Sequence, residues 1–256
     1  MSSYITRKTP GDTAWFRHDR FGMFIHFGLY SMPARHEWIK SLEEIPEEKY
    51  DLYFRNFNPD LYDPREWARQ AKAAGMKYAV MTTKHHEGFC LFDSQYTDYK
   101  STNTPAGRDL IREYVDAFRA EGLRIGFYYS LIDWHHPDFP IDHLHPRRSD
   151  PDAFKQSKGR NMHRYAEYMR NQVRELLTNY GKIDVLWFDY SYDAQPGFPE
   201  WMRGKGKDDW EADKLIALAR SLQPGIIIDN RTQVEQDVWT PEQYQLQSWP
   251  RHKETG

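Results

Sequence analysis

The chain has 256 residues and a formal net charge of −3, without a stripe of basic residues, which argues against a nucleic acid as its partner. Its single cysteine, Cys90, excludes an internal disulfide framework. No run approaches the roughly 18 apolar residues of a membrane span, and the N-terminal segment lacks the apolar stretch of a signal peptide. We therefore expect a cytoplasmic protein that does not enter a membrane.

Apolar strands and amphipathic helices alternate along the chain. The first helix with clear boundaries begins at Asp63, which suits the N-cap, with Pro64 in its first turn, and it ends at Gly75. Further helices are predicted at 108–121, 160–180 and 208–222. Strands are predicted at 21–28, 77–82, 123–130, 183–190, 225–230 and, as a possible sixth, 243–249. Alternation of this kind is typical of parallel β–α units.

The order of these elements predicts an α/β fold, and specifically a (β/α)8-like TIM barrel. Polar residues follow the carboxyl ends of the predicted strands, which is where barrel enzymes place their chemistry. No glycine-rich phosphate-binding motif follows any strand, so an open nucleotide-binding sheet is the weaker alternative. About six strands are readable, whereas closure of such a barrel takes eight. Either two irregular strands escape the pattern, or the barrel is incomplete.

The segment 183–190, IDVLWFDY, contains the residue on which the functional interpretation depends. Val185 and Leu186 belong to a short apolar run typical of a strand buried on both faces, and Asp189 lies at its end. A carboxylate beside large aromatic residues is costly to bury unless it has a partner or a chemical role. Asp189 is therefore either structural, as a cap or an ion-pair partner, or catalytic.

Other strand ends add candidates that could converge with Asp189 above one barrel mouth. These candidates are His26, His85, His86, Tyr128, Tyr129, Trp187, Arg231 and Glu242. A metal-dependent hydrolase would use the histidines as ligands, but His85 and His86 are neighbours, and neighbours on a strand face opposite sides. A glycosidase needs two carboxyl groups and neither metal nor cofactor, with histidines and aromatic rings binding the sugar. We favour the glycosidase.

Six segments of the chain resemble, in the same order, the α-L-fucosidases of glycoside hydrolase family 29. They are FGMFIHFG at 21–28, HEW at 36–38, KHHEGF at 84–89, GFYYS at 126–130, VLWFD at 185–189 and TPEQ at 240–243. HFG, KHHEGF and WFD are the most specific of them. The resemblance implies a retaining exo-glycosidase that releases terminal α-linked L-fucose from a fucosylated oligosaccharide or glycoconjugate, through a covalent fucosyl-enzyme.

The resemblance also implies roles for individual residues. Asp189 matches the catalytic nucleophile and Glu242 the general acid/base, for which Glu37 is the second candidate. The residues that match the fucose-binding pocket are His26, Glu37, Trp38, His85, His86, Tyr129, Trp187 and Arg231. The long polar loops at 137–159 and 190–207 are predicted to shape the preference for the leaving sugar.

The closeness of Glu242 to the last residue, Gly256, bears on the domain organisation. Members of the family usually continue through the last barrel strands into a β-sandwich. Residues 1–256 are therefore expected to form a single catalytic barrel domain without that sandwich. An incomplete barrel leaves strand edges unpaired, and a homo-oligomer is one way to cover them. The alternative function is that of an inactive, fucose-binding remnant of the barrel.

Overall fold

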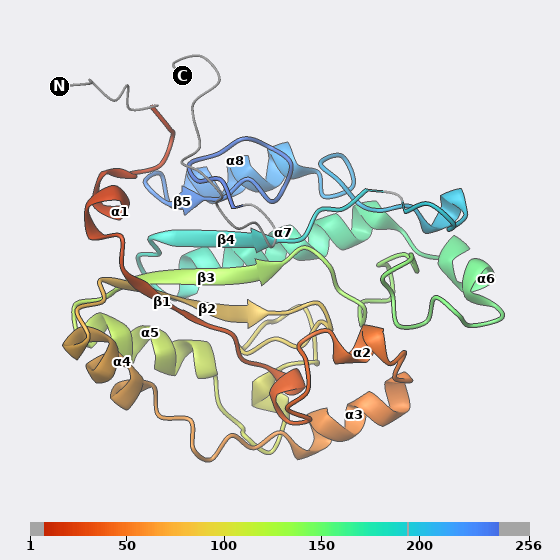
Figure 1. The fold of residues 1–256 in the computed structure, drawn as a ribbon, viewed down its shortest axis with the longest axis horizontal. Coiled ribbons are helices and arrows are strands. Elements are labelled where there is room, and N and C mark those ends of the chain that lie inside the picture. Colours follow the sequence, from red (N-terminus) through yellow and green to blue (C-terminus); the bar gives the residue numbers. More distant parts are fainter. Residues whose placement is uncertain (1–7, 194, 241–256) are drawn as a thin grey trace.

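The computed structural model describes residues 8–193 and 195–240. Within these ranges, five parallel strands form one sheet in the order β1-β2-β3-β4-β5 (Figure 1). The strands are β1 (Gly22–Ile25), β2 (Tyr78–Lys84), β3 (Arg124–Ser130), β4 (Val185–Asp189) and β5 (Ile227–Ile228). Parallel neighbours that follow the order of the chain are the consecutive strands of a (β/α)8 barrel. The prediction of an α/β fold of the TIM-barrel type is confirmed, whereas the predicted sixth strand lies outside the described residues.

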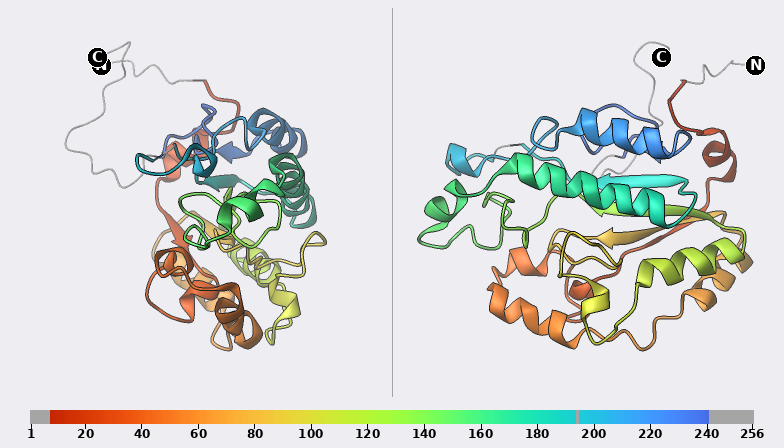
Figure 2. Two further views of the ribbon diagram at one scale, coloured as in Figure 1. Left: turned by 90° about the vertical axis from the view of Figure 1, so that its right-hand side faces the viewer. Right: turned by 180° about the vertical axis from the view of Figure 1, so that it is seen from behind.

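Helices surround the sheet (Figures 1 and 2). They are α1 (Ala14–Asp19), α2 (Ile39–Leu42), α3 (Glu47–Asn56), α4 (Pro64–Ala73), α5 (Leu110–Ala120), α6 (Ala153–Lys158), α7 (Met162–Asn179) and α8 (Ala212–Leu222). Short 3₁₀ helices lie at Leu29–Ser31, Ser101–Asn103 and Glu200–Met202. α4 packs against α5 and α7 against α8, and these four helices cover one face of the sheet.

The helix boundaries follow from local chemistry that is visible in the sequence. Asp63 caps α4 by accepting a hydrogen bond from the Glu66 N–H at 3.0 Å, and Pro64 occupies the first turn. α4 ends before Gly75, whose φ of +88° suits glycine. The predicted ends of α4, α5 and α7 are correct to within a few residues. α6 lies inside 137–159, for which the sequence predicts only a loop.

Side chains alternate between the two faces of the sheet, and the two faces pack differently. The helix-covered face contributes Met81, Phe127, Leu186 and Phe188 to the main hydrophobic core. The opposite face carries a smaller cluster formed by Val80, Tyr128, Val185 and Ile227. Phe24 contacts the rings of Tyr128 and Trp187 on this second face and remains 48% exposed. Within the described residues, the second face is therefore only partly covered.

The carboxyl ends of the strands lie at one edge of the sheet, and the segments α2, α3 and α6 gather beyond that edge (Figure 1). β1 ends at Ile25 and β2 ends at Lys84. His26 and His85 are therefore the first residues after these two strands. Because parallel α/β proteins bind their ligands at this edge, it is the place at which to examine the predicted site.

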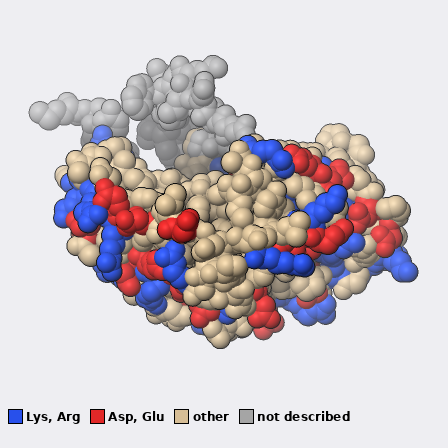
Figure 3. Space-filling view, turned by 90° about the horizontal axis from the view of Figure 1, so that it is seen from below, with Lys and Arg blue, Asp and Glu red and all other residues tan. Residues whose placement is uncertain are grey.

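Charged side chains of both signs are interspersed over the face of the molecule shown in Figure 3. This distribution agrees with the small net charge of the chain. The 18-residue α7 carries several charged side chains along its length. In the part of the chain that the structure describes, no helix is both long and apolar enough to cross a membrane.

Candidate active site

A cavity of about 360 Å³ opens at the carboxyl ends of the strands. Its walls come from the segments that follow β1 and β2, the loop that follows β3, and the end of β4. They are formed by His26, His36, Glu37, Trp38, Leu42, His85, Leu144, Asp189 and Tyr190. The residues of this wall that the sequence predicts for the site are His26, Glu37, Trp38, His85 and Asp189. A cavity of this size suits a small organic ligand.

Asp189 is the last residue of β4, and groups from three other segments orient its carboxylate. The hydroxyl of Tyr128 donates a hydrogen bond to Oδ2 at 2.7 Å. Nε2 of His86 lies 3.8 Å from Oδ2, and Nη1 of Arg231 lies 3.5 Å from Oδ1. The Asp189 side chain is 14% exposed and borders the cavity. A carboxylate held in this way can act as a nucleophile, because its oxygens are oriented before a ligand enters the cavity.

Tyr128, and not the predicted Tyr129, supplies the hydroxyl group at this site. Alternate residues of β3 face opposite sides of the sheet, so the neighbouring tyrosines point apart. Tyr129 is fully buried on the helix side, where its hydroxyl donates to Oε1 of Gln172 at 2.8 Å. The prediction for Tyr129 is therefore wrong. Burial and the negative charge of Asp189 raise the pKa of Tyr128 well above its ordinary value, so this hydroxyl keeps its proton.

Trp187 and Arg231 lie beside Asp189 and hold its neighbours in place. The Trp187 ring stacks on the Tyr128 ring, with centroids 5.5 Å apart and an interplanar angle of 18°. The Arg231 guanidinium lies 5.1 Å from the Trp187 ring centroid, and its Nε donates to Oγ1 of Thr240 at 3.0 Å. Arginine is never deprotonated in proteins, so Arg231 is a permanent positive charge next to the carboxylate.

Three histidines at the site are each fixed through Nδ1. The partner atoms are Oγ1 of Thr82 for His26 at 2.9 Å, Oε2 of Glu87 for His85 at 3.2 Å and Oγ of Ser130 for His86 at 2.6 Å. Burial lowers the pKa of His26 to about 4 and that of His85 to about 3. Burial also lowers the pKa of His86 well below its ordinary value. All three rings are thus neutral at neutral pH, with Nε2 as the remaining polar atom.

His85 and His86 both reach the site although they are neighbours in the sequence. β2 ends at Lys84, so the backbone beyond it no longer imposes the alternation of a strand. The two ring centroids lie 4.0 Å apart. The expectation that these histidines face opposite sides is therefore wrong. Among residues 8–193 and 195–240, no group of three or more His, Cys, Asp or Glu side chains is placed to hold a metal ion.

Aromatic and aliphatic side chains form the remaining wall of the cavity. The ring centroids of Trp38 and Tyr190 lie 5.4 Å apart. Leu42 is 61% exposed and therefore belongs to the rim. Ser41 Oγ donates to the backbone oxygen of Leu144 at 2.6 Å, which joins α2 to the loop that follows β3. The rim thus combines the apolar Leu42 with the partly exposed polar side chains of His36 and Glu37.

The long loops that follow β3 and β4 meet at a buried ion pair. Nζ of Lys205 lies 3.2 Å from Oδ2 of Asp142, and the two side chains are 4% and 0% exposed. Oδ1 of Asp142 also accepts a hydrogen bond from the Leu144 N–H at 3.0 Å. Leu144 and Tyr190, one from each loop, border the cavity. Through these two residues, both loops contribute to the wall of the cavity.

Asp229 is a residue near the site that the sequence analysis does not single out. It directly follows β5, is 1% exposed, and accepts a hydrogen bond from the Phe188 N–H at 3.2 Å. Burial, reinforced by Asp189 and opposed by this hydrogen bond, raises the pKa of Asp229 well above its ordinary value. A second ionised carboxylate beside Asp189 is therefore disfavoured. Its place at a strand end, within GIIIDN, is the signal that could have identified it.

Comparison with known families agrees with this geometry. A family model described as alpha-L-fucosidase matches residues 5–254, which include every residue of the cavity. The chain belongs to the α-L-fucosidase family. The resemblance inferred from its six short segments is thereby confirmed.

Relatives in the α-L-fucosidase family match most of this chain. Tissue α-L-fucosidase of Homo sapiens is 30% identical over 198 residues, which are 71% of this chain and 40% of that protein. Plasma α-L-fucosidase of Homo sapiens is 32% identical over 216 residues, which are 74% of this chain and 43% of that protein. The chain thus spans about two fifths of the length of these relatives.

Solved structures of α-L-fucosidases share the fold. Isoenzyme 1 from Paenibacillus thiaminolyticus has a TM-score of 0.78 and 60% identity, over 86% of this chain and 50% of that chain. A second structure is a family 29 enzyme from Bacteroides thetaiotaomicron, trapped as a covalent intermediate in complex with 2-fluoro-fucosyl fluoride. It has a TM-score of 0.70 and 34% identity, over 89% of this chain and 51% of that chain. About half of each longer chain corresponds to this one.

The two acid/base candidates implied by the α-L-fucosidase resemblance differ in what the structure describes. Glu37 borders the same cavity as Asp189. The Glu37 side chain is 37% exposed, and its Oε2 lies 3.6 Å from Nδ1 of His36. Glu242 lies outside the described residues. The catalytic roles of both glutamates stay predictions.

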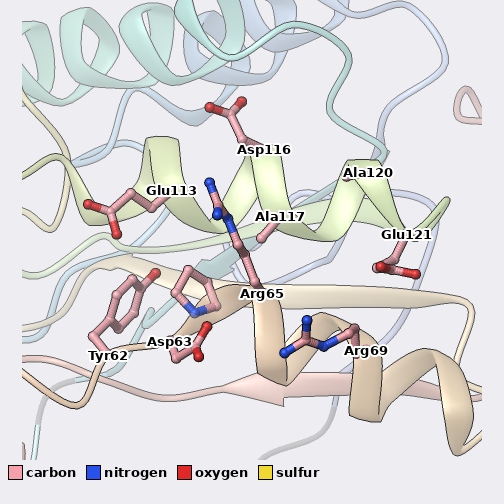
Figure 4. A pocket seen from close by; sticks show the side chains of 10 residues that line it. Tyr62, Asp63, Arg65, Arg69, Glu113, Asp116, Ala117, Ala120 and Glu121 are labelled. Atoms are coloured by element: carbon pink, nitrogen blue, oxygen red, sulfur yellow. The ribbon is translucent and has the colours of Figure 1, made fainter.

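A larger cavity, of about 600 Å³, lies between α4 and α5, away from the strand ends (Figure 4). It is lined by Tyr62, Asp63, Pro64, Arg65, Arg69, Glu113, Asp116, Ala117, Ala120 and Glu121. Arg65 extends from α4 toward α5 in Figure 4. None of these lining residues belongs to the strand-end site, so size alone does not identify the functional cavity.

Proposed function

We propose that this chain hydrolyses terminal α-L-fucosyl linkages of an oligosaccharide or glycoconjugate, with retention of configuration, and releases L-fucose. The observation that carries the proposal is the Asp189 carboxylate, held by Tyr128 and Arg231 beside a cavity that neutral histidines line. The covalent intermediate trapped in the relative from Bacteroides thetaiotaomicron supports the same route. Family membership supports fucose as the sugar.

In the first step, Asp189 attacks the anomeric carbon of the bound fucoside. A bond forms between one carboxylate oxygen and this carbon while the bond to the leaving oxygen breaks, which gives a fucosyl–Asp189 ester. Tyr128 keeps its proton and donates to Oδ2 of Asp189 before the attack. Because Tyr128 and Arg231 already orient the nucleophile, little reorganisation is needed to reach the reactive geometry.

A second carboxyl group completes the reaction. We assign Glu242 as the acid that protonates the leaving oxygen and as the base that later activates a water molecule. Glu37 is the second candidate, and its position in the wall of the cavity supports it. Retaining glycosidases hold their two carboxyl groups about 5–5.5 Å apart, so the residue in this role must approach Asp189 to about that distance.

The remaining groups of the cavity suit a neutral sugar. A neutral imidazole offers one donor and one acceptor, and Nε2 of His26 or His85 is the atom available to a sugar hydroxyl. Trp38 offers an apolar ring face against which the C–H groups of a sugar can pack. The cavity thus combines polar atoms for hydroxyl groups with an aromatic face, which is the chemistry that a pyranose requires.

Incubation of the purified chain with 4-nitrophenyl α-L-fucoside tests the proposed function. We expect release of 4-nitrophenol, with α-L-fucose as the first product seen by 1H NMR before mutarotation. β-L-Fucose as the first product would exclude the covalent route. Fucose binding without turnover would support the inactive remnant, and turnover that a chelator abolishes and zinc restores would support a metal-dependent hydrolase.

The neighbouring tyrosines of β3 provide a matched pair of variants. Tyr128→Phe removes the hydrogen bond to Asp189 and is expected to lower kcat/KM about ten- to a hundredfold, the effect of losing a hydrogen bond to a charged group. Tyr129→Phe removes only the bond to Gln172, so we expect kcat/KM to stay within about twofold and stability to fall by about 1 kcal/mol. Steady-state kinetics and urea denaturation measure both effects. Equal kinetic losses in the two variants would contradict the assignment of Tyr128.

A further inference from the structure

Glu87 contacts the site through His85 and has no part in the reaction proposed above. It is 1% exposed, and its Oε2 lies 3.2 Å from Nδ1 of His85. Its other oxygen, Oε1, is buried and makes no hydrogen bond within the described ranges of the chain. An ionised carboxyl group is costly to bury with so few partners. The ionised and neutral forms of Glu87 are therefore close in free energy. His85 is the group in contact with the carboxyl group that changes.

Two lysines near the pair, Lys40 beside Glu87 and Lys84 beside His85, have other partners. Nζ of Lys40 lies 2.9 Å from Oε2 of Glu47, and Nζ of Lys84 lies 3.0 Å from Oδ2 of Asp133. The other titratable groups that face Glu87 are His26, Tyr30, Tyr50, Tyr99, Tyr128 and Asp133. The groups that face His85 are His26, Tyr30, His36, Glu37, Lys84, His86 and Tyr128. In the described part of the chain, none of them forms an ion pair with Glu87.

The extra proton of this pair resides on the carboxyl group and not on the ring. Burial raises the pKa of Glu87 to about 7, whereas burial lowers the pKa of His85 to about 3. Surroundings of low polarity favour the neutral form of both groups, which explains the opposite directions. Near neutral pH, Glu87 therefore changes between its ionised and neutral forms while the ring of His85 stays neutral.

We propose that Glu87 is a positioning residue that selects the tautomer of His85 and so decides which hydrogen-bond role His85 offers in the cavity. When Glu87 is ionised, Nδ1–H donates to Oε2, and the lone pair on Nε2 accepts from a ligand. When the pair takes up one proton, the Nδ1 proton passes to Oε2 while Nε2 binds a proton from solvent, so the O–H of Glu87 now donates to Nδ1. The single ring proton is then on Nε2, which becomes a donor. The pair changes from one negative charge to none.

The tautomer of His85 can be read directly from the 15N chemical shifts of its ring, with the signals assigned by their loss in His85→Gln. We expect a proton on Nδ1 about one pH unit above the Glu87 pKa of about 7, and a proton on Nε2 about one unit below it. Glu87→Gln should abolish this change with pH. The matched control is Glu175→Gln. Burial also raises the pKa of Glu175, but this side chain accepts a hydrogen bond from Ser94 and does not contact His85. We expect the tautomer change of His85 to persist in this variant.

Two outcomes would overturn the proposal. One is the same tautomer at both pH values, and the other is a ring with both nitrogens protonated at the lower pH. The chemical-shift measurement does not require catalytic turnover. A tautomer change in a chain without fucosidase activity would therefore support the role of Glu87 and refute the function proposed above, on which only the identity of the ligand rests.

Steady-state kinetics then show whether a bound sugar forms a hydrogen bond with Nε2 of His85, the atom that changes from acceptor to donor. For 4-nitrophenyl α-L-fucoside, we expect KM to change about fivefold across the same pH range, the effect of one hydrogen bond, with a smaller change in kcat. KM of Glu87→Gln should lose this pH dependence, whereas KM of Glu175→Gln should keep it. A KM profile that is identical in wild type and Glu87→Gln would contradict a role of Glu87 in ligand binding.

Discussion

Asp189→Asn is expected to lower kcat for 4-nitrophenyl α-L-fucoside by about a thousandfold or more, which corresponds to about 4 kcal/mol of transition-state stabilisation. The amide has nearly the shape of the carboxylate and can still accept the hydrogen bond from Tyr128. It lacks the negative charge that attacks the anomeric carbon. The fold should be unaffected, and circular dichroism and thermal unfolding would establish this. Activity near that of wild type would end the assignment of Asp189 as the nucleophile.

Matched variants separate the nucleophile from the acid/base. Loss of the general acid matters less when the leaving group needs no proton, so Glu242→Gln should retain more activity toward 2,4-dinitrophenyl α-L-fucoside than toward the 4-nitrophenyl substrate. Asp189→Asn should be impaired with both substrates. Addition of azide should then yield the β-azide from the nucleophile variant and the α-azide from the acid/base variant. If Glu37→Gln and not Glu242→Gln behaves in this way, the role belongs to Glu37.

Lys84→Met is expected to destabilise the fold by about 3–5 kcal/mol, because it leaves the carboxylate of Asp133 buried without its cation. The two side chains are 0% and 2% exposed, and Nζ lies 3.0 Å from Oδ2. Nζ also lies 3.2 Å from the Tyr165 hydroxyl and 4.6 Å from the ring centroid of Tyr129. Burial favours the neutral acid, but Lys84, His136 and His135 outweigh it and lower the pKa of Asp133. Urea denaturation measures the loss.

A second substitution tests the cause of this loss. Lys84→Met combined with Asp133→Asn removes both charges and should recover part of the stability, because no unpaired charge remains. Lys214→Met is the surface control, since Lys214 pairs with Glu211 at 3.0 Å but is 68% exposed. It should change stability by less than about 1 kcal/mol. A Lys84→Met chain as stable as the control would show that the buried pair contributes little.

The elements that the sequence predicts well are those set by local chemistry. Single residues define both ends of α4. Asp63 caps its start, Pro64 fixes φ in its first turn, and Gly75 adopts a left-handed conformation after its end. The place of Asp189 at the end of an apolar strand also follows from local sequence, although this alone leaves a structural and a catalytic role open, and the resemblance of VLWFD favours the second. His26, predicted from its place after a strand, and Trp38, implied by the family resemblance, both line the cavity.

Other features depend on register and on contacts between distant segments. Tyr128 and Tyr129 both end an apolar strand, and only the pairing of Tyr128 with Trp187 determines which one shares a face with Asp189. The position of Leu144 depends on Asp142, whose partner Lys205 is 63 residues away. No local pattern signals such a pairing. Residues that the long loops carry into the site therefore emerge only from the structure.

The buried pair of Asp142 and Lys205 has a consequence for the thermodynamics of binding. Since this pair joins the two loops, the wall formed by Leu144 and Tyr190 already exists in the free protein. The loss of conformational entropy by these loops accompanies folding and does not recur when a ligand arrives. A monosaccharide offers little apolar area to offset such a loss. A rigid receptor therefore lets a small, strongly hydrated ligand bind through a few hydrogen bonds and one aromatic contact.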